Sequence, residues 1–278
     1  MLKQRVITAL VLVALLLGAL AWSSLAFAVL LTLAFALAQA EWLQLAGWRF
    51  APALAVALAL GAAQVAALVA APSLVDAVTM PLVTVATVVW LVVGSLLLRS
   101  EQSGPVRIAP WVSTLLAVLL PLAAWSALML FLRVGAATLL SVLVIVWLAD
   151  TAAYFSGRAF GRRKLAPHIS PGKTWAGVWG AIAAVIIVAL IAWKAVPTAP
   201  VYTNRVLDAF GVLAALPALA FLVAVSIVGD LFESLLKRQA NVKDSSRLLP
   251  GHGGVLDRID ALIAVLPAAA LLDLWLRR

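Results

Sequence analysis

Long apolar runs, each followed by a short polar break, dominate the chain. The runs are continuous rather than alternating, which favours helices, and most approach the roughly 20 residues that a helix needs to cross a bilayer. A backbone in hydrocarbon must satisfy its own hydrogen bonds, and only helices and closed barrels do so. The pattern predicts about nine membrane-spanning helices, near residues 6–21, 25–40, 51–71, 77–98, 108–132, 134–155, 177–195, 210–229 and 255–275.

The first two apolar runs are shorter than a typical span. We expect them to form a tight helical hairpin that turns at residues 22–24. The first run also has features of a secretory signal, because a basic start precedes it and residues 19–21 have the small side chains of a cleavage site. A second apolar run follows directly, which favours retention of the first.

Composition supports the same class of fold. Of 278 residues, 65% are hydrophobic and 11% are charged, and the mean hydropathy is +1.15. These values predict an all-α, polytopic integral membrane protein rather than soluble domains. The chain has no cysteine, which excludes disulfides, thiolate metal sites and cysteine nucleophiles. With only two histidines, any metal site must rely on carboxylate oxygens, which suits a hard cation such as Mg²⁺.

The distribution of positive charge predicts how the helices are oriented. The net charge is +9, yet no basic domain lies outside the apolar runs, so nucleic acid is not an expected partner. With nine spans and a cytoplasmic N terminus, most of the 20 Lys and Arg residues fall in cytoplasmic segments, as the positive-inside rule requires. The C terminus is then on the outer side. The exceptions to the charge rule are Arg133, Lys194, Arg205, Arg277 and Arg278.

Three regions organise the chain. Residues 1–98 form an N-terminal transmembrane region with four spans, and residues 99–155 form a middle transmembrane hairpin. Residues 156–278 form a C-terminal transmembrane region with cytoplasmic loops, which we predict to be catalytic. Its two long charged segments, 156–176 and 226–260, lie on the predicted cytoplasmic side, where they can meet at one site.

The segment 226–260 places both signs of charge beside apolar helices. Ionisable groups there are costly, so such a cluster indicates a functional site. Asp230, Glu233 and Lys237 are spaced i, i+3 and i+7, and they share one face if the helix continues beyond Gly229. A solvated helix end with internal ion pairs is the alternative. Asp230 argues against it, because no basic residue lies three or four positions away.

The last apolar run is preceded by a glycine-rich motif, PGHGG at residues 250–254. Its glycines permit close approach of the backbone to a ligand. The N-terminal amides of the following helix favour anions, and Asp257 and Asp260 lie on one face of that helix. A simple helix-initiating turn is the alternative, but it does not explain the surrounding Lys, Arg and His residues.

The polar loop at residues 156–175 is rich in basic residues and contains no acid. Its Ser170, Lys173 and Thr174 resemble the end of a phosphate-binding P-loop, but Pro167 occupies the position of the first glycine and an apolar helix precedes the loop. A lysine and two hydroxyls without a competing carboxylate still suit phosphate. Attraction to the membrane surface is the alternative for the other basic residues of the loop.

The C-terminal half carries a series of short motifs, which are DTAAY at 150–154, GRAFGRRK at 157–164, ISP at 169–171, KTW at 173–175, KR at 237–238, KDSS at 243–246, LPGHGG at 249–254 and DRID at 257–260. In this order they resemble the signature of phosphatidate cytidylyltransferases, also called CDP-diacylglycerol synthases. Two positions in the first loop depart from that pattern, since Gly172 stands where a second lysine is usual and Ala176 where a glutamate is usual. The N-terminal half resembles the family only in hydropathy.

The resemblance implies a reaction and its surroundings. The cytidylyl group of CTP is transferred to phosphatidic acid, which gives CDP-diacylglycerol and pyrophosphate in phospholipid biosynthesis and requires Mg²⁺. Family members are integral membrane homodimers, and we expect a bacterial cytoplasmic (inner) membrane, a cytoplasmic active site and K⁺ as a second candidate cation. Carried over by position, Asp230 and Asp257 are the metal-binding carboxylates.

The charges of this reaction suggest roles for the remaining polar residues. A phosphate monoester with a second pKa of about 6 is mostly dianionic at neutral pH, so no strong general base is needed. Catalysis then depends on positioning and on neutralising negative charge. The predicted catalytic residues are Asp230, Asp257, Lys243 and His252. The predicted substrate contacts are Lys173, Ser170, Thr174, Lys237, Arg238, Asp244 and Arg258.

Three alternatives differ in class from this interpretation. A related CTP-dependent enzyme acting on another lipid would keep the charged segments and change only the groove for the acyl chains. A transporter would place its acids near mid-membrane, often in two related halves, whereas the acids here cluster at predicted helix ends. A noncatalytic scaffold would not need the glycine-rich, mixed-charge segment.

Overall fold

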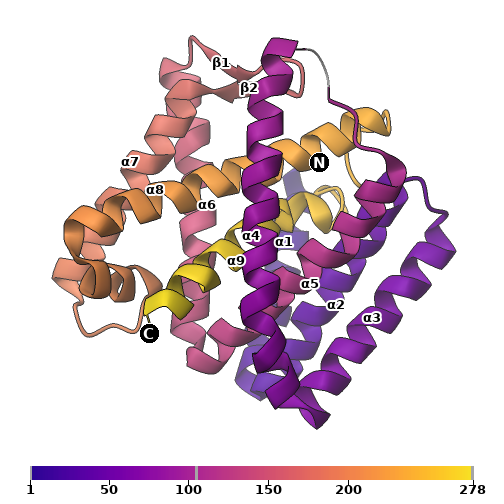
Figure 1. Cartoon of the computed structure of the whole chain (residues 1–278), viewed down its shortest axis with the longest axis horizontal. Helices are drawn as coiled ribbons and strands as arrows, with labels where there is room; N and C mark the ends of the chain where they lie inside the picture. The colour runs from indigo at the N-terminus through magenta and orange to yellow at the C-terminus, as the bar shows by residue number, and fades with distance from the viewer. Residues whose placement is uncertain (1, 104–105, 277–278) are drawn as a thin grey trace.

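The computed structural model describes residues 2–103 and 106–276, which contain nine α-helices and one short β-hairpin (Figure 1). Arg277 and Arg278, which the charge pattern assigns to the outer side, lie outside the described residues. The elements in chain order are α1 (Leu2–Trp22), α2 (Ser24–Leu45), α3 (Phe50–Ala70), α4 (Pro72–Ser103), α5 (Pro110–Val134), α6 (Ala136–Phe160), β1 (Lys164–Ala166), β2 (Ser170–Thr174), α7 (Trp175–Ala195), α8 (Tyr202–Gln239) and α9 (Leu256–Leu276).

Each predicted apolar run forms a helix, which confirms the all-α polytopic fold. Within the described residues, the seven helices from α2 to α8 are long and apolar enough to cross a membrane, so the predicted number of nine spans is not established. The apolar part of α1, Val6–Trp22, is shorter. The first two helices turn where the sequence predicts, because the Ser23 hydroxyl caps α2 by accepting a hydrogen bond from the Ala26 amide at 3.0 Å.

Helix α9 forms the centre of the helical assembly (Figure 1). It packs against α2, α4, α5, α6 and α8. Its residues Ile263, Ala264, Val265 and Leu266 are fully buried, as expected for a helix stretch that is apolar on all sides. The helices of the N-terminal, middle and C-terminal regions thus contribute to one hydrophobic core.

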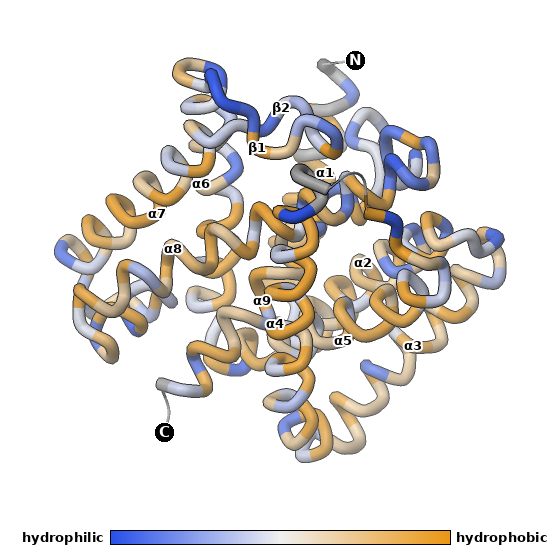
Figure 2. The backbone as a smooth tube through the Cα atoms, turned by 45° about the horizontal axis from the view of Figure 1, so that its top comes forward, coloured by the Kyte–Doolittle hydropathy of each residue, from blue (hydrophilic) through white to orange (hydrophobic). Residues whose placement is uncertain are grey.

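Polar segments gather mainly at the end of the molecule that carries the β-hairpin (Figure 2). At this end, Thr8 of α1 donates a hydrogen bond to the Pro250 carbonyl at 2.9 Å. The Gln239 side chain at the end of α8 donates to the carbonyl of Val106, before α5, at 3.2 Å. Segments that the charge pattern assigns to one side of the membrane therefore meet at one end of the fold.

Helix α8 is longer than the predicted eighth span in both directions. It begins at Tyr202 and contains a kink at Gly211, where φ is 70° and ψ is 163°. Glycine adopts this positive φ without the steric cost that other residues bear. Beyond Gly229 the helix continues to Gln239, so the predicted charged face is formed.

The first basic loop contains structure that the sequence does not predict. Helix α6 extends to Phe160, and the antiparallel strands β1 and β2 follow it. The charged sequence lacks the alternation typical of strands. The hairpin is instead anchored by burial of Ala166 and Ile169 and by the cap of α7, where the Thr174 hydroxyl accepts a hydrogen bond from the Gly177 amide at 3.2 Å.

Helix α2 continues to Leu45, although the sequence predicts a polar break at residues 41–50. Glu41, which marks the start of that break in the sequence, is fully buried. A buried carboxylate requires hydrogen-bond donors close by. All of its hydrogen-bond donors among the described residues belong to the C-terminal region of the chain.

Candidate active site

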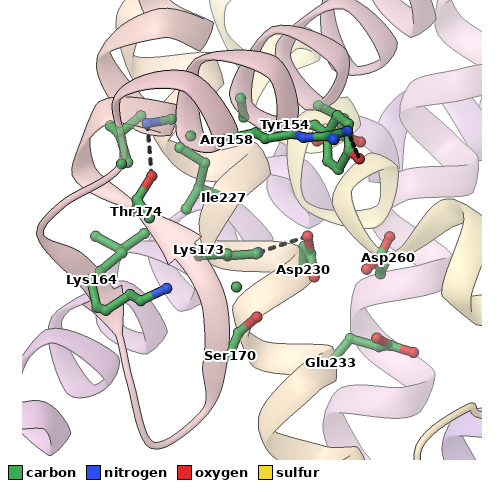
Figure 3. A pocket seen from close by; sticks show the side chains of 18 of the residues that line it. Tyr154, Arg158, Lys164, Ser170, Lys173, Thr174, Ile227, Asp230, Glu233 and Asp260 are labelled. Carbon is green, nitrogen blue, oxygen red and sulfur yellow. Dashed lines mark hydrogen bonds and ion pairs between the residues drawn. The ribbon is translucent and has the colours of Figure 1, made fainter.

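A cavity of about 710 Å³ lies at the polar end of the molecule (Figure 3). Its walls come from the C-terminal end of α6, the β-hairpin, α7, the C-terminal part of α8, the following loop and the first turns of α9. Acidic and basic side chains line it in similar number. The acids are Asp150, Asp230, Glu233, Asp244, Asp257 and Asp260, and the bases are Arg158, Lys164, Lys173, Lys237 and Arg258.

Lys173 and Asp230 connect the hairpin to α8. The Lys173 ammonium lies 2.7 Å from Oδ2 of Asp230 (Figure 3). Their side chains are 20% and 37% exposed, and both line the cavity. Asp230 has no basic neighbour on its own helix turn, and its partner comes from the other charged segment, as the sequence predicts for two segments that share a site.

Three carboxylates form a tight group beside this pair. One oxygen from each of Asp230, Glu233 and Asp260 lies within 4.8 Å of the others. Oε1 of Glu233 is buried and has no hydrogen-bond partner among the described residues. Carboxylates this close repel one another unless a cation or a proton intervenes. The sequence pairs Asp230 with Asp257 as metal ligands, whereas the structure groups Asp230 with Glu233 and Asp260.

Close packing at Gly229 brings these carboxylates together. A Cβ atom at this position would lie 2.8 Å from the Asp260 carbonyl oxygen and 2.8 Å from Cβ of Ala264. Such distances are too short for real contacts, so glycine allows α8 and α9 to approach. Asp230 follows directly in the chain, and the approach therefore sets its distance from Asp260.

Asp257 is held by a lysine on one side and by the backbone on the other. Lys237 donates to Oδ1 at 2.7 Å and also pairs with Glu233 four residues earlier on α8. The amides of Ser245 and Gly254 donate to Oδ2 at 2.9 and 2.8 Å. Both oxygens of Asp257 are thus fixed, and Lys237 joins two acids that line the cavity.

The structure brings most of the predicted site residues to one cavity. The eight that line it are Ser170, Lys173, Thr174, Asp230, Lys237, Asp244, Asp257 and Arg258. Lys243 is exposed and does not line it. His252 also lies outside the lining, and its Nδ1 is buried without a partner among the described residues. Arg238 donates to the Ile169 carbonyl at 3.4 Å and so contacts the hairpin instead.

Besides the acids Asp150, Glu233 and Asp260, three further residues at or behind the cavity were not predicted as catalytic, substrate-binding or metal-binding residues. Arg158 and Lys164 line the cavity, and Arg158 donates to the Tyr154 hydroxyl at 3.3 Å (Figure 3). Tyr154 and Arg158 are spaced i, i+4 on α6, and this spacing was the available signal in the sequence for their contact. Glu41 lies behind the cavity, and no local pattern indicates it, because the serine that it contacts is 204 residues away in the chain.

This arrangement suits polyphosphate groups accompanied by a cation. Basic side chains from several elements offer charge-assisted hydrogen bonds to phosphate oxygens. The carboxylate group offers hard oxygen ligands of the kind that Mg²⁺ prefers. Fold and site together define a polytopic membrane protein with a phosphate-handling site at one end of its helices.

Comparison with known proteins identifies the family. The cytidylyltransferase family matches residues 3–275, and the chain belongs to that family. A phosphatidate cytidylyltransferase of Pseudomonas aeruginosa is 42% identical over 278 residues, which cover 99% of this chain and 97% of that protein. The proteins of the same name from Haemophilus influenzae and Bacillus subtilis are 49% and 42% identical over 133 and 125 residues, which cover 48% and 45% of this chain and 44% and 42% of those proteins. The family resemblance is confirmed and extends into the N-terminal half.

Proposed function

We propose that the chain transfers the cytidylyl group of CTP to phosphatidic acid, with CDP-diacylglycerol and pyrophosphate as products. The observation that carries this proposal is the cavity in which basic residues from β2, α8 and α9 surround a carboxylate group at the polar end of an apolar helix assembly. Membership of the cytidylyltransferase family and the names of the relatives support the same reaction.

The reaction requires one bond to form and one to break at the α-phosphorus of CTP. An oxygen of the lipid phosphate attacks that phosphorus, and the bond to the oxygen bridging to the β-phosphate breaks, which releases pyrophosphate. The nucleophile is mostly dianionic at neutral pH because its second pKa is about 6, so the protein need not remove a proton. The main barrier that the site must lower is repulsion between two anions.

Basic residues around the cavity can reduce this repulsion. Lys173, Lys237 and Arg258 belong to three different elements, so they can contact phosphate groups from several directions. In the structure, Lys173 pairs with Asp230 and Lys237 pairs with Asp257. We expect both lysines to exchange these carboxylates for phosphate oxygens when the nucleotide binds.

Mg²⁺ is the proposed cofactor, held by Asp230 with neighbouring carboxylates. The grouped oxygens and the unpartnered Oε1 of Glu233 fit a hard divalent cation. When bound, Mg²⁺ would neutralise and orient phosphate oxygens. Asp257 was predicted as the second ligand, and it lines the same cavity while it binds Lys237.

Two variants separate the candidate metal ligands. Replacement of a direct ligand, as in Asp257→Asn or Asp260→Asn, should raise the Mg²⁺ concentration that gives half-maximal binding, measured by isothermal titration calorimetry with CTP present. The variant with the larger increase identifies the stronger ligand. Addition of K⁺ to the same titration tests whether a monovalent cation shares the site.

Location and assembly complete the proposal. The apolar helices and the bacterial relatives support a multi-pass membrane protein. The positive charge pattern favours a bacterial cytoplasmic membrane with the cavity on the cytoplasmic side, where CTP is available. The bilayer supplies phosphatidic acid. The family resemblance supports a homodimer as part of the proposal, and the mass of the purified protein in nanodiscs tests it.

The deciding assay uses purified protein in mixed micelles with phosphatidic acid, Mg²⁺ and CTP labelled at the α-phosphate. We expect the label to enter the lipid fraction as CDP-diacylglycerol, with one pyrophosphate released per lipid product. Diacylglycerol in place of phosphatidic acid should give no product, because it lacks the attacking phosphate. Folded protein that binds CTP but forms no labelled lipid would overturn the proposal.

A further inference from the structure

Glu41 is a buried carboxylate on α2, far in sequence from every motif that resembles the family. It is 0% exposed, and it lies near the C-terminal end of its helix. Among the residues that the structure describes, no Lys, Arg or His forms an ion pair with it. A buried charge without an ionic partner is costly unless hydrogen bonds compensate.

Four hydrogen-bond donors from one short segment compensate the Glu41 charge. Its Oε1 accepts from the Ser246 hydroxyl at 2.6 Å and from the Val255 amide at 3.0 Å. Its Oε2 accepts from the Leu256 amide at 2.6 Å and lies 3.0 Å from the Ser245 hydroxyl. One carboxylate thus holds both ends of the segment from residue 245 to residue 256.

Two of these donors are backbone amides at the beginning of α9, whose first residue is Leu256. The amides of a first helical turn have no partner within the helix, and a negative charge beside them is favourable. A capping side chain usually belongs to the residue just before the helix. Here the carboxylate comes from α2, so it also fixes the first turn of α9 relative to the N-terminal helices.

The same segment holds Asp257, which lines the cavity. The Ser245 amide donates to Oδ2 of Asp257 at 2.9 Å, and the Ser245 hydroxyl lies 3.0 Å from the same oxygen. That hydroxyl has one proton and stands between the carboxylates of Glu41 and Asp257, so it donates to one of them at a time. Ser245 therefore links Glu41 to the carboxylate that binds Lys237.

Two glycines of the PGHGG motif make room for this linkage. A Cβ atom at Gly254 would clash with the Ser245 hydroxyl and with Oε2 of Glu41. Gly253 has a φ of +85°, and a Cβ atom there would lie 2.8 Å from Oδ2 of Asp257. The sequence suggests that these glycines admit a ligand. In the structure they admit two carboxylates of the protein.

We infer that Glu41 is a positioning residue for the cytidylyl transfer. It acts through Ser245 and the first turn of α9 to hold Asp257 in the orientation in which this carboxylate meets Lys237 and the cavity. The inference rests on the proposed function for its kinetic consequences, but the geometry that it describes can be tested without turnover.

Glu41→Gln is the sharpest single change, because it preserves size and shape. One oxygen becomes an amide nitrogen that donates instead of accepting. Whichever oxygen is replaced, an amide of Val255 or Leu256 then faces another donor. The segment must shift to relieve that contact, and Asp257 shifts with it.

We expect Glu41→Gln to lower kcat by about 10- to 100-fold, the range for partners that orient ligand-bearing residues. KM for CTP should change by a smaller factor than kcat, because Glu41 itself contacts none of the bases that line the cavity. The Mg²⁺- and CTP-induced increase in the thermal unfolding temperature of the detergent-solubilised protein should shrink as well. Ser245→Ala removes only the hydroxyl link and should change kcat in the same direction by a smaller factor.

Gln39→Leu provides a matched control on the same helix. Gln39 is also buried, and its side chain donates to the Ala117 carbonyl at 2.9 Å, away from the cavity. The control should lower the unfolding temperature by an amount similar to Glu41→Gln. Its kcat per folded molecule and its ligand-induced thermal shift should remain those of the unmodified protein.

Two results would overturn the inference. One is an unchanged kcat and ligand-induced thermal shift in Glu41→Gln. The other is a loss of activity in Glu41→Gln that Gln39→Leu reproduces at equal loss of stability, which would make Glu41 a structural residue only. If the unmodified protein binds Mg²⁺ and CTP but forms no CDP-lipid, the proposed function fails, and the thermal shifts of the two variants still decide the role of Glu41.

Discussion

The acids at the two ends of α9 have different kinds of partner. At the end opposite the cavity, Asp273 is fully buried and its Oδ1 accepts two hydrogen bonds from Arg205, at 3.1 and 2.7 Å. At the cavity end, Asp260 lies beside Asp230 and Glu233, and no ion pair with a base is formed by Asp260 among the described residues. One helix therefore carries a paired acid at one end and a grouped acid at the other.

This difference refines the rule that acids in apolar helices indicate function. The residues directly before and after Asp273 and Asp260 are apolar in both cases. Asp273 has a fixed internal partner, so its role is to join α8 to α9. Asp260 has acidic neighbours that line a cavity, which favours a ligand. The partners of these two carboxylates thus separate a structural acid from a site acid.

The largest expected effect is that of Asp230→Asn. Loss of this charge removes one of the three grouped carboxylates, and we expect turnover to fall by at least about 100-fold, the scale for removing one electrostatic contact to a transition state. The measurement is the rate of CDP-diacylglycerol formation by purified protein. Asp208→Asn is the matched control, because Asp208 is exposed and accepts from the Trp193 ring nitrogen at 2.6 Å at the other end. Similar rates of CDP-diacylglycerol formation for both variants would show that the acids at the cavity end are no more important for turnover than those at the opposite end.

Asp273→Asn should produce the opposite pattern. It leaves Arg205, whose side chain is 34% exposed, without its counter-charge, and we expect the free energy of unfolding to fall by about 1 kcal/mol, the upper value for a pair with solvent access. Turnover per folded molecule should be nearly unchanged. Chemical unfolding in detergent measures the first quantity, and an assay at low temperature measures the second. A variant that keeps its stability but loses turnover would place Asp273 in the functional machinery instead.

Lys173→Ala tests the contact between the hairpin and α8. We expect KM for CTP to rise by about tenfold, which corresponds to one charge-assisted hydrogen bond. Initial rates over a range of CTP concentrations provide the measurement. Lys194→Ala removes a lysine that lies 4.3 Å from the Trp193 ring at the opposite end, and it should leave KM unchanged. An unchanged KM in Lys173→Ala would show that the lysine serves only Asp230.

The smallest expected effect is that of Lys243→Ala. The sequence predicts a catalytic role for Lys243, but its side chain is exposed outside the cavity lining. A screened charge at such a position should change KM for CTP by about threefold or less. The same rate measurements apply. An increase larger than that of Lys173→Ala would show that the loop closes on the nucleotide and would restore the predicted role.

Much of the candidate site could be predicted because its signals are local. The spacing of Asp230, Glu233 and Lys237 predicts their common face on α8. The acid-free loop that contains Lys173 is predicted to share one site with that face, and Lys173 does pair with Asp230. The β-hairpin and Glu41 could not be predicted in this way. Strand pairing at the hairpin depends on burial of Ile169, and the contacts of Glu41 join two distant parts of the chain.

The sequence by itself determined the helical membrane architecture, the approximate position of each helix and the family, although α8 extends well beyond its predicted span at both ends. Continuous apolar runs of this length leave helices as the stable structure in a bilayer. The short motifs of the C-terminal half follow one another in the order that is typical of the family. Only the tertiary structure decided which carboxylates meet. That outcome depends on the close approach of α8 and α9 at Gly229 and on the cap that α2 supplies to α9 through Glu41. Both are contacts between helices, and the periodicity of a single helix does not encode the helix against which it packs.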